Sequence, residues 1–305
     1  MILTVCCNPC IDEYLYIPQF KPGGLNRVTH KSFFLAGKGI NVAKSAARLG
    51  ADVVTTGFMF ANDNIKFNKD LRTFGVKCKF VELAGSARVN LKIIDSTGAT
   101  TELNDNSIRV GEDSQNKLIN TVKALSMDCE FAVFSGSLPL GVENDFYYKL
   151  AKEAKLPFAV DAEGDILTAT LPLKPTIVKP NIMELEQIAK RSLETREDLI
   201  DASRQLIKMG AKYVLVSRGK LGALLVSDKQ AISASIEGIT QVSPTGAGDA
   251  MLAVAVIKLI EKAPLQEIAR AAVAAGTAAV LTAGTLPLKT DVYEGYLKQV
   301  TVEEV

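Results

Sequence analysis

The chain has 305 residues and a formal charge of +1, with 35 Lys and Arg against 34 Asp and Glu. Hydrophobic residues make up 48% of it and aromatic residues 6%, a composition that excludes a disordered chain, a collagen and a strongly basic nucleic-acid binder. A chain of this length buries about three quarters of its unfolded surface, so it needs no metal ion or disulfide to fold. Length alone allows one large α/β domain or two domains of about 150 residues each.

The start of the chain and its cysteines bear on the compartment. Met1–Val5 lacks the basic region of a signal peptide, and polar residues begin at Asn8. Five cysteines are an odd number without the spacing of a disulfide framework. Cys7 and Cys10 precede a strand-like segment rather than the helix that a redox pair needs. We therefore expect a cytoplasmic protein with free thiols.

The uncharged stretch Ala271–Leu288 raises the question of a membrane span. It is rich in Ala, Gly and Thr, and Gly284 and Pro287 interrupt it. A spanning helix needs about 20 strongly apolar residues. The stretch therefore predicts a tightly packed internal helix, and we expect no membrane partner.

Apolar strands and amphipathic helices alternate along most of the chain. In chain order, we expect a strand over Ile2–Cys6, a helix over Gly39–Leu49, a strand over Val53–Phe58 and a helix over Asn62–Phe74. Four further short apolar runs, most of them followed by a helical segment, are Phe131–Phe134, Phe158–Val160, Ile177–Val178 and Tyr213–Val216. This alternation predicts an α/β fold with a mainly parallel sheet covered by helices on both faces.

Two regions, Asp12–Phe34 and Arg88–Asn104, break this rhythm. The second alternates, with Val89, Leu91 and Ile93 on one side and Asn90 and Lys92 on the other. Both regions predict antiparallel strands set off from the main sheet. We therefore expect one domain over residues 1–305 with a small β-strand lid inserted at about residues 12–34 and 88–104.

Two familiar nucleotide-binding motifs are absent. A Walker loop needs Ser or Thr after Gly-Lys, but Gly39 follows Gly37-Lys38. A dinucleotide fingerprint needs a third glycine three residues after Gly-x-Gly, and Val42 or Met251 stands there instead.

The segment Ser243–Ala253 carries the strongest signal for chemistry. Its glycine-rich part, Gly246-Ala-Gly248, precedes an apolar helix expected from Ala250 to Ile260. Unblocked amides at such a helix start, together with the helix dipole, form an anion site. A carboxylate beside that site repels an anion, so Asp249 is better suited to accept a proton from an attacking hydroxyl. The alternative, that Asp249 only caps the helix, stays open on these residues alone.

Several motifs in order resemble those of the PfkB, or ribokinase-like, carbohydrate kinases. Thr245-Gly-Ala-Gly-Asp249 resembles the family's C-terminal signature, and Leu35–Ala43 resembles its N-terminal glycine signature. Between them, in the family's order, lie Ser135–Pro139, Lys179–Leu185 and Val216–Ala223. The resemblance covers essentially the whole chain and implies a ribokinase-like three-layer sandwich with a β-strand lid.

Further motifs resemble the branch of the family that phosphorylates sugar phosphates. They are Thr4–Asp12, Arg88–Asn90 and Thr101–Asn104. That branch includes 1-phosphofructokinase and tagatose-6-phosphate kinase. The resemblance implies ATP-dependent phosphorylation of a ketohexose phosphate, and we expect fructose 1-phosphate as acceptor, with tagatose 6-phosphate as the alternative. A homodimer through the lid strands follows by analogy.

The resemblance also assigns residues to the site. The acceptor sugar phosphate would be bound by Asp12, Arg27, Gly37, Lys38, Asn41, Arg88, Asn90 and Ser137. ATP would be bound by Lys179, Asn181, Ser217, Gly219, Gly222, Gly246 and Gly248. Asp249 would be the base, the loop Gly246, Ala247 and Gly248 would stabilise the transferring phosphoryl group, and Mg²⁺ would be reached through water from Asn181 and Glu184.

Chemistry agrees with part of this assignment and leaves alternatives. An arginine fork and a lysine point charge suit a phosphate, which favours Arg88 and Lys38. Arg27 and Lys179 are as well explained as surface residues, and Asn181 with Glu184 is also a helix-capping pair. The glycine signature departs from the family by having Leu35-Ala36 at its start. A non-catalytic sugar-phosphate sensor on the same fold, or a kinase of nucleosides or unphosphorylated sugars, remains an alternative function.

Overall fold

The apolar runs form the strands of one central sheet in a computed structural model that describes residues 1–106, 108–240, 243 and 245–305. The strand order is β15-β14-β13-β12-β11-β10-β9-β1-β4-β5, with β6 also paired to β4. The strands are parallel from β5 to β12, and β13, β14 and β15 extend the sheet in antiparallel pairs. Their bounds are β1 Ile2–Cys6, β4 Val53–Phe60, β5 Lys77–Cys78, β6 Val81–Leu83, β9 Phe131–Ser135, β10 Phe158–Asp161, β11 Ile177–Val178, β12 Tyr213–Ser217, β13 Ala223–Val226, β14 Ala231–Ser235 and β15 Thr301–Glu304.

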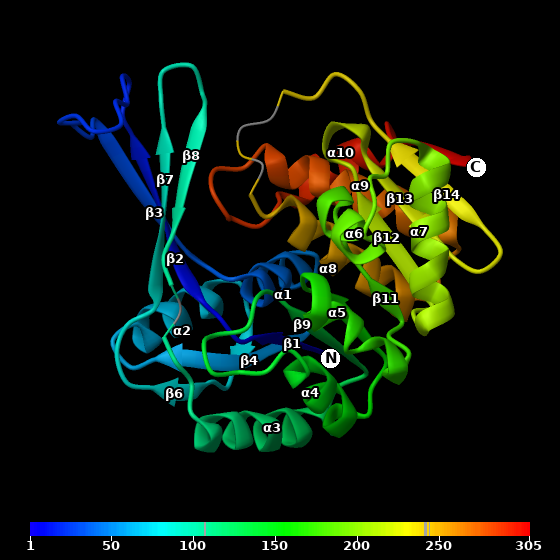
Figure 1. The fold of residues 1–305 in the computed structure, drawn as a ribbon, viewed down its shortest axis with the longest axis horizontal. Coiled ribbons are helices and arrows are strands. Elements are labelled where there is room, and N and C mark those ends of the chain that lie inside the picture. Colours follow the sequence, from blue (N-terminus) through cyan, green and yellow to red (C-terminus); the bar gives the residue numbers. More distant parts are fainter. Residues whose placement is uncertain (107, 241–242, 244) are drawn as a thin grey trace.

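Helices cover both faces of this sheet (Figure 1). Side chains alternate along a strand, so Ile2 and Cys6 of β1 pack in one core while Leu3 and Val5 pack in the other. The first core includes residues of α1, α8 and α9, and the second includes residues of α3, α4 and α7. The helix bounds are α1 Lys38–Arg48, α2 Asn64–Thr73, α3 Glu112–Ser126, α4 Phe146–Ala154, α5 Gly164–Thr168, α6 Ile182–Ala189, α7 Arg196–Met209, α8 Ala247–Ile260, α9 Leu265–Val280 and α10 Thr290–Leu297. The predicted α/β fold with a mainly parallel, two-sided sheet is confirmed.

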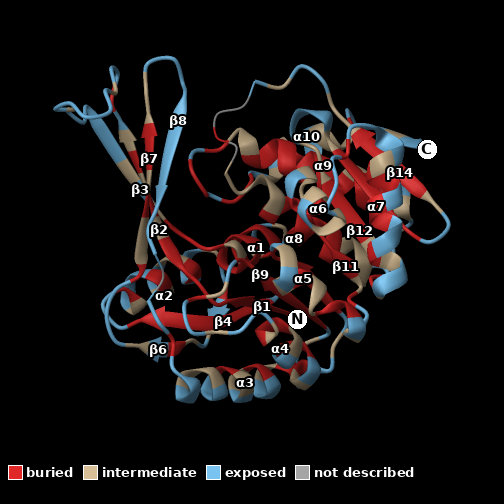
Figure 2. Ribbon diagram, in the orientation of Figure 1, coloured by how far each residue is buried: buried red, intermediate tan, exposed pale blue. Residues whose placement is uncertain are grey.

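A second sheet of four strands stands apart from the central sheet (Figures 1 and 2). We call it the small sheet; its strands are β2 Cys10–Tyr16, β3 His30–Ala36, β7 Arg88–Ile94 and β8 Thr100–Asn104, in the order β3-β2-β7-β8. The prediction of antiparallel strands is wrong for one pair, because β2 and β7 run parallel. Both strands leave parallel strands of the central sheet in the same direction, β2 after β1 and β7 after β6.

The first two helices, α1 and α2, match the prediction within one or two residues at each end, and two later helices differ more. α8 begins at Ala247, three residues earlier than expected, and Asp249 lies in its first turn. α9 ends at Val280, so Ala271–Leu288 is only partly helical. The chain turns at Gly284, whose φ is +58°, and a Cβ there would lie 2.2 Å from the ring of Phe34 on β3. The segment after α9 thus passes close to the small sheet.

The remaining sequence expectations concern the membrane and the thiols. No helix within the described ranges is both long and apolar enough to cross a bilayer. All five cysteines are free thiols. Pro244, part of the segment Ser243–Ala253, lies outside the described residues.

Candidate active site

Two adjoining cavities lie where the parallel strands end at their carboxyl edge, the usual ligand position in α/β sheets. The first, the polar cavity, has a volume of about 530 Å³ and lies between the small sheet and the central sheet. The second, the apolar cavity, has a volume of about 520 Å³ and lies over α8 and α9. Asn181, Ser217 and Gly248 line both. These three residues form a wall shared by the two cavities. We call the place where the cavities meet at this wall the junction.

Most residues expected in the site line these cavities. The polar cavity is lined by Asp12, Gly37, Lys38, Asn41, Arg88, Asn90, Ser137, Lys179, Asn181, Glu184, Ser217, Gly246, Gly248 and Asp249. Gly219, Gly222 and Ala247 line the apolar cavity. Arg27 is the exception, since it is exposed in the segment between β2 and β3 and lines neither cavity.

Asp249 is a buried carboxylate at the junction. It is 6% exposed, and Asn41 Nδ2 of α1 donates to its Oδ2 at 2.8 Å. Burial and, next, the charge of Asp161 raise the pKa of Asp249 to about 7, against the opposing effects of Lys38, Asn41 and Lys179. A carboxyl that titrates near neutral pH can accept and release a proton under physiological conditions.

The start of α8 presents amides beside this carboxylate. Gly246 is the N-cap residue, with a left-handed φ of +85° that a residue with a side chain would strain to adopt. The amides of Ala247, Gly248 and Asp249 have no acceptor within the helix, because the first N–H groups of any helix lack one. With the helix dipole they form an anion site next to the carboxylate.

Asp161 is a central residue that sequence reasoning missed. It is fully buried at the end of β10, where its Oδ1 lies 3.0 Å from Lys38 Nζ and its Oδ2 lies 3.2 Å from Lys179 Nζ. Burial alone would raise the pKa of Asp161, but the charges of Lys179 and Lys38 lower it. A signal existed in the sequence, because Asp161 directly follows the predicted strand Phe158–Val160 at its carboxyl end.

Lys38 and Lys179 are therefore held by carboxylates. Lys38 Nζ also lies 3.8 Å from Glu184 Oε1, and the charge of Asp161 raises the pKa of Lys38 although burial opposes it. A Cβ on Gly248 would lie 3.0 Å from Lys179 Nζ, so this ammonium reaches the start of α8. Lys179 is buried, which removes the interpretation of a surface lysine.

Arg88 differs from these lysines because its hydrogen-bond partners are neutral. Its Nε donates to Asn8 Oδ1 at 3.2 Å and one terminal nitrogen donates to Asn90 Oδ1 at 2.8 Å. Asn8 in turn donates to Ser137 Oγ at 3.0 Å. Among the residues that the structure describes, no carboxylate forms an ion pair with Arg88. Its charge is thus available to an anion in the polar cavity.

Asp12 lies opposite Asn90 in the register of β2 and β7, so both side chains point to the same face of the small sheet. Asn90 Nδ2 donates to Asp12 Oδ1 at 3.0 Å, and the Cys10 thiol lies 3.6 Å from the same oxygen. An acceptor-only carboxylate at this point suits a ligand with hydroxyl groups.

Asn181 and Glu184 form the capping box that the sequence left open as an alternative. Asn181 Oδ1 accepts from the Glu184 amide at 2.8 Å, and Glu184 Oε2 accepts from the Asn181 amide at 2.9 Å. Glu184 Oε1 is not used by the cap. Within the described part of the chain, no cluster of three or more metal-ligating side chains occurs. One carboxylate oxygen is too few for a metal cage but suits an ion that keeps most of its waters.

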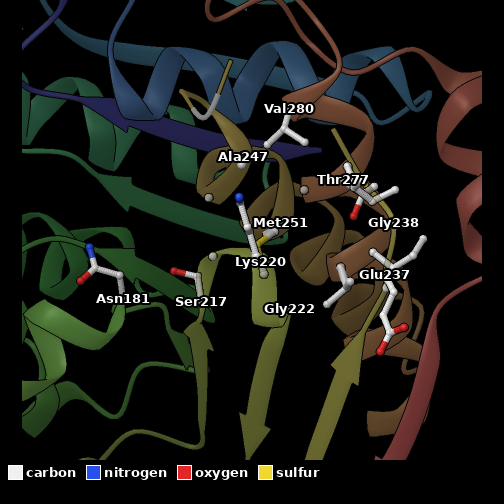
Figure 3. A pocket seen from close by; sticks show the side chains of 16 residues that line it. Asn181, Ser217, Lys220, Gly222, Glu237, Gly238, Ala247, Met251, Thr277 and Val280 are labelled. Atoms are coloured by element: carbon white, nitrogen blue, oxygen red, sulfur yellow. The ribbon is translucent and has the colours of Figure 1, made fainter. Parts of the chain in front are cut away.

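The apolar cavity is shown in Figure 3. Val273, Thr277 and Val280 of α9 and Met251 of α8 form much of its wall. A Cβ on Gly276 would lie 2.8 Å from Met251 Cγ, so the small residues of α9 serve the close packing of α8 and α9 as well as the cavity. Lys220, which sequence reasoning missed, extends across the cavity in the direction of Ala247 (Figure 3).

With this geometry established, comparison with known proteins identifies the class of protein. Residues 6–291 match the pfkB family of carbohydrate kinases, and the chain belongs to that family. It is 33% identical to a 1-phosphofructokinase of Borreliella burgdorferi, with 100% of this chain and 99% of that protein covered. It is 30% identical to a tagatose-6-phosphate kinase of Staphylococcus epidermidis, with 100% of each covered.

A solved structure agrees with this assignment. Phosphofructokinase-2 from Escherichia coli, in complex with substrates and products, is similar with a TM-score of 0.90 and 31% identity. The match covers 98% of this chain and 99% of that chain. The ribokinase-like fold and the carbohydrate-kinase class that the motifs predicted are therefore confirmed.

Proposed function

We propose that this protein transfers the γ-phosphoryl group of ATP to a ketohexose phosphate, with fructose 1-phosphate as the acceptor. The observation that carries this proposal is that Arg88, whose partners are neutral, and Asp249, whose pKa is about 7, line the same cavity. A phosphate held by Arg88 would leave the sugar's hydroxyl groups to Asp249. The names of relatives, 1-phosphofructokinase and tagatose-6-phosphate kinase, support both acceptors.

Asp249 acts as the general base. Its carboxylate accepts the proton of the attacking hydroxyl, while Asn41 fixes its orientation through the hydrogen bond to Oδ2. The free amides of Ala247, Gly248 and Asp249 stabilise the charge of the phosphoryl group in transit. Positioning and electrostatics of this kind supply most of the catalysis of phosphoryl transfer.

The cations divide between two tasks. Arg88 and Ser137 bind the phosphate already on the acceptor, and Asp12 and Asn90 bind its hydroxyl groups. Lys38 and Lys179 share the carboxylate of Asp161 next to the start of α8, so we assign them to the transferring phosphoryl group rather than to the acceptor's phosphate.

ATP occupies the apolar cavity, with its phosphates toward the shared wall. The base lies against Val273 and Val280, and Ser217, Gly219, Gly222 and Lys220 border the phosphates. Glu184 and Asn181 would hold Mg²⁺ largely through water, since the capping box leaves Glu184 Oε1 unused and Lys38 Nζ lies 3.8 Å from that oxygen. When bound, Mg²⁺ neutralises charge on the nucleotide phosphates.

The whole chain, residues 1–305, is one kinase domain in which the small sheet is a lid over the polar cavity. When the lid closes over the polar cavity, it excludes water. Water therefore cannot take the place of the acceptor hydroxyl and hydrolyse ATP. Both substrates are metabolites of the cytoplasm, where we expect the enzyme to act.

The outer face of the small sheet supports a homodimer. Phe33 of β3, Leu91 of β7 and Leu103 of β8 lie in one row on the face opposite Asp12 and Asn90, and Glu13 of β2 stands between Phe33 and Leu91. Phe33 is 64% and Leu103 52% exposed. Apolar residues on an exposed sheet face indicate a surface that another chain covers.

Turnover measurements with several acceptors test the proposed function. ADP release is followed with fructose 1-phosphate, tagatose 6-phosphate, fructose 6-phosphate and fructose, at saturating MgATP. We expect the highest kcat/KM with fructose 1-phosphate and little turnover of fructose. Tight binding of a sugar phosphate without turnover would favour a sensor, and a preference for fructose would favour a kinase of unphosphorylated sugars.

Arg88→Ala supplies a matched test of the phosphate site. Losing a charged, forked contact should raise KM for fructose 1-phosphate about tenfold or more, with KM for ATP little changed. Arg204→Ala, an exposed arginine of α7 outside both cavities, is the control. An unchanged KM in Arg88→Ala would contradict the assignment of the acceptor's phosphate.

A further inference from the structure

Lys92 is a buried cation of the polar cavity to which the proposed reaction gives no task. Arg88, Asn90 and Lys92 alternate along β7, so their side chains point to the same face, and all three line the cavity. The side chain of Lys92 is only 7% exposed. Burying an ammonium group costs free energy unless partners compensate, so its position in the wall of a ligand cavity calls for a reason.

Glu102 of β8 is one partner of Lys92. Lys92 Nζ donates to Glu102 Oε1 at 2.8 Å, and the two residues lie opposite each other in the strand register. The Glu102 side chain is 46% exposed, so water competes for it and the pair is weaker than a buried one. An ammonium group has three donors, and Glu102 is its one hydrogen-bond acceptor among the described residues.

Asp12 and Tyr14 of β2 are the other titratable groups that face Lys92. The Tyr14 ring centroid lies 6.0 Å from Lys92 Nζ. Burial would lower the pKa of Lys92, but the hydrogen bond to Glu102 and the charges of Asp12 and Glu102 raise it. The side chain therefore remains a charged donor at neutral pH.

Asp12 has a complementary set of contacts. Its Oδ1 accepts from Asn90 and from the Cys10 thiol, and no described residue donates to its Oδ2. A carboxylate only accepts hydrogen bonds, an ammonium only donates them, and a sugar hydroxyl does both. One hydroxyl group placed between Asp12 and Lys92 would satisfy all three groups.

We propose that Lys92 is a ligand of the acceptor sugar: it donates to the oxygen of a hydroxyl group whose proton is donated to Asp12. This inference rests on the proposed function, since it concerns the acceptor of that reaction. It makes Lys92 a specificity-determining residue that selects a hydroxyl at one position of the sugar, while Arg88 selects the phosphate.

A purely structural role is the competing explanation, in which Lys92 and Glu102 only join β7 to β8. Variants of the two partners separate these roles. If the pair is structural, Lys92→Met and Glu102→Gln remove the same interaction and should change the enzyme alike. If Lys92 binds the sugar, Glu102→Gln removes a competitor for its ammonium group. Lys92→Met should then weaken the affinity for the sugar, whereas Glu102→Gln should strengthen it or leave it unchanged.

The experiment measures KM for fructose 1-phosphate and for ATP, together with the thermal midpoint, in the wild type and both variants. We expect Lys92→Met to raise KM for fructose 1-phosphate about tenfold or more, the cost of a lost charge-assisted hydrogen bond. KM for ATP should stay within about twofold, and Glu102→Gln should leave KM for the sugar phosphate unchanged or lower it. Equal increases in both variants, or no increase in Lys92→Met, would overturn the proposal.

Calorimetry measures the binding of fructose 1-phosphate, tagatose 6-phosphate and fructose 6-phosphate without turnover. It therefore tests the contact of Lys92 with the sugar independently of the proposed kinase activity. If the wild type binds a sugar phosphate without turnover, the kinase proposal fails, while a weaker affinity in Lys92→Met still supports the ligand. If the wild type binds none of them, both fail. Lys92→Gln, which keeps a neutral donor, replaces Lys92→Met should that variant not fold, and an affinity equal to the wild type's would then contradict the charged contact.

Monodeoxy analogues of fructose 1-phosphate identify the hydroxyl. For one analogue, the wild type should lose about as much affinity as Lys92→Met loses with the full substrate. Lys92→Met should bind that analogue no more weakly than the full substrate. If every analogue weakens both proteins by the same factor, Lys92 contacts no hydroxyl and the proposal is wrong.

Discussion

At the residue scale, Asp249 combines a functional advantage with a cost in stability. It is buried beside Asp161, and both facts favour its neutral form, so its pKa rises from the ordinary 3.8 to about 7. A base with a pKa near the working pH is efficient, because enough of it is ionised and it still binds a proton well. The same burial means that ionising it weakens the folded state.

The pH dependence of catalysis follows from that pKa. Because the base must be ionised to accept a proton, kcat/KM for the sugar phosphate should rise about tenfold per pH unit below pH 7 and level off above it. Initial rates between pH 5.5 and 9 measure this profile. A profile that is flat across pH 6 to 8 would exclude Asp249 as the titrating base.

Replacing Asp249 by Asn tests catalysis and stability together. We expect kcat to fall by about 10²-fold or more, because the base is lost. The folded pKa lies above the unfolded value, so the wild type loses stability as pH rises from about 4 to about 7, and the variant avoids this loss. The variant's thermal midpoint should therefore exceed that of the wild type at pH 8 and approach it near pH 4. Near-normal turnover, or a lower midpoint at pH 8, would contradict this account.

At the scale of elements, local sequence patterns predicted where strands occur better than they predicted which strands pair and in which direction. Alternation in Val89–Ile93 identified a strand with one polar face, and the structure places that face on the polar cavity. The parallel pairing of β2 and β7 was not predictable from the pattern, because alternation is the same in parallel and antiparallel strands. The turn at Gly284 packs against Phe34, a residue 250 positions away in the chain that no local pattern reveals.

The outer face of the small sheet yields a prediction about assembly. Phe33→Asp places a charge on the most exposed residue of the row, at its β3 end, and we expect it to convert a dimer into a monomer. Ile65→Asp is the matched control, since Ile65 is 83% exposed and belongs to α2 rather than to the small sheet. Light scattering after size exclusion gives the masses. A wild type that is monomeric, or a Phe33→Asp variant that stays dimeric, would contradict an interface through the small sheet.

At the scale of the whole molecule, motifs predicted the fold, and most of the residues that they singled out line the two cavities, but the motifs did not predict which charged groups pair with one another. Lys38 was expected beside the acceptor's phosphate, yet it pairs with Asp161, which no motif singled out. Arg27 was expected in the site and lies outside both cavities. Pairings of this kind join segments that are distant in the chain, here the start of α1, the end of β10 and the segment after β11, and only the tertiary fold brings them together.

The net charge of +1 is consistent with an enzyme for small anions. The polar cavity gathers Arg88, Lys92, Lys38 and Lys179 at one place, and carboxylates nearby and elsewhere balance their charge. A metabolite-sized anion needs only such a local group of cations and oriented amides.

The central claim is that Asp249 and the start of α8 direct the phosphoryl group of ATP to a sugar hydroxyl rather than to water. Phosphorus NMR of the products formed from fructose 1-phosphate and MgATP tests this most directly. We expect the resonances of fructose 1,6-bisphosphate to appear as that of fructose 1-phosphate disappears, with the newly formed 6-phosphate in a one-to-one ratio with ADP. ADP formed together with inorganic phosphate, and without a new ester, would contradict the claim.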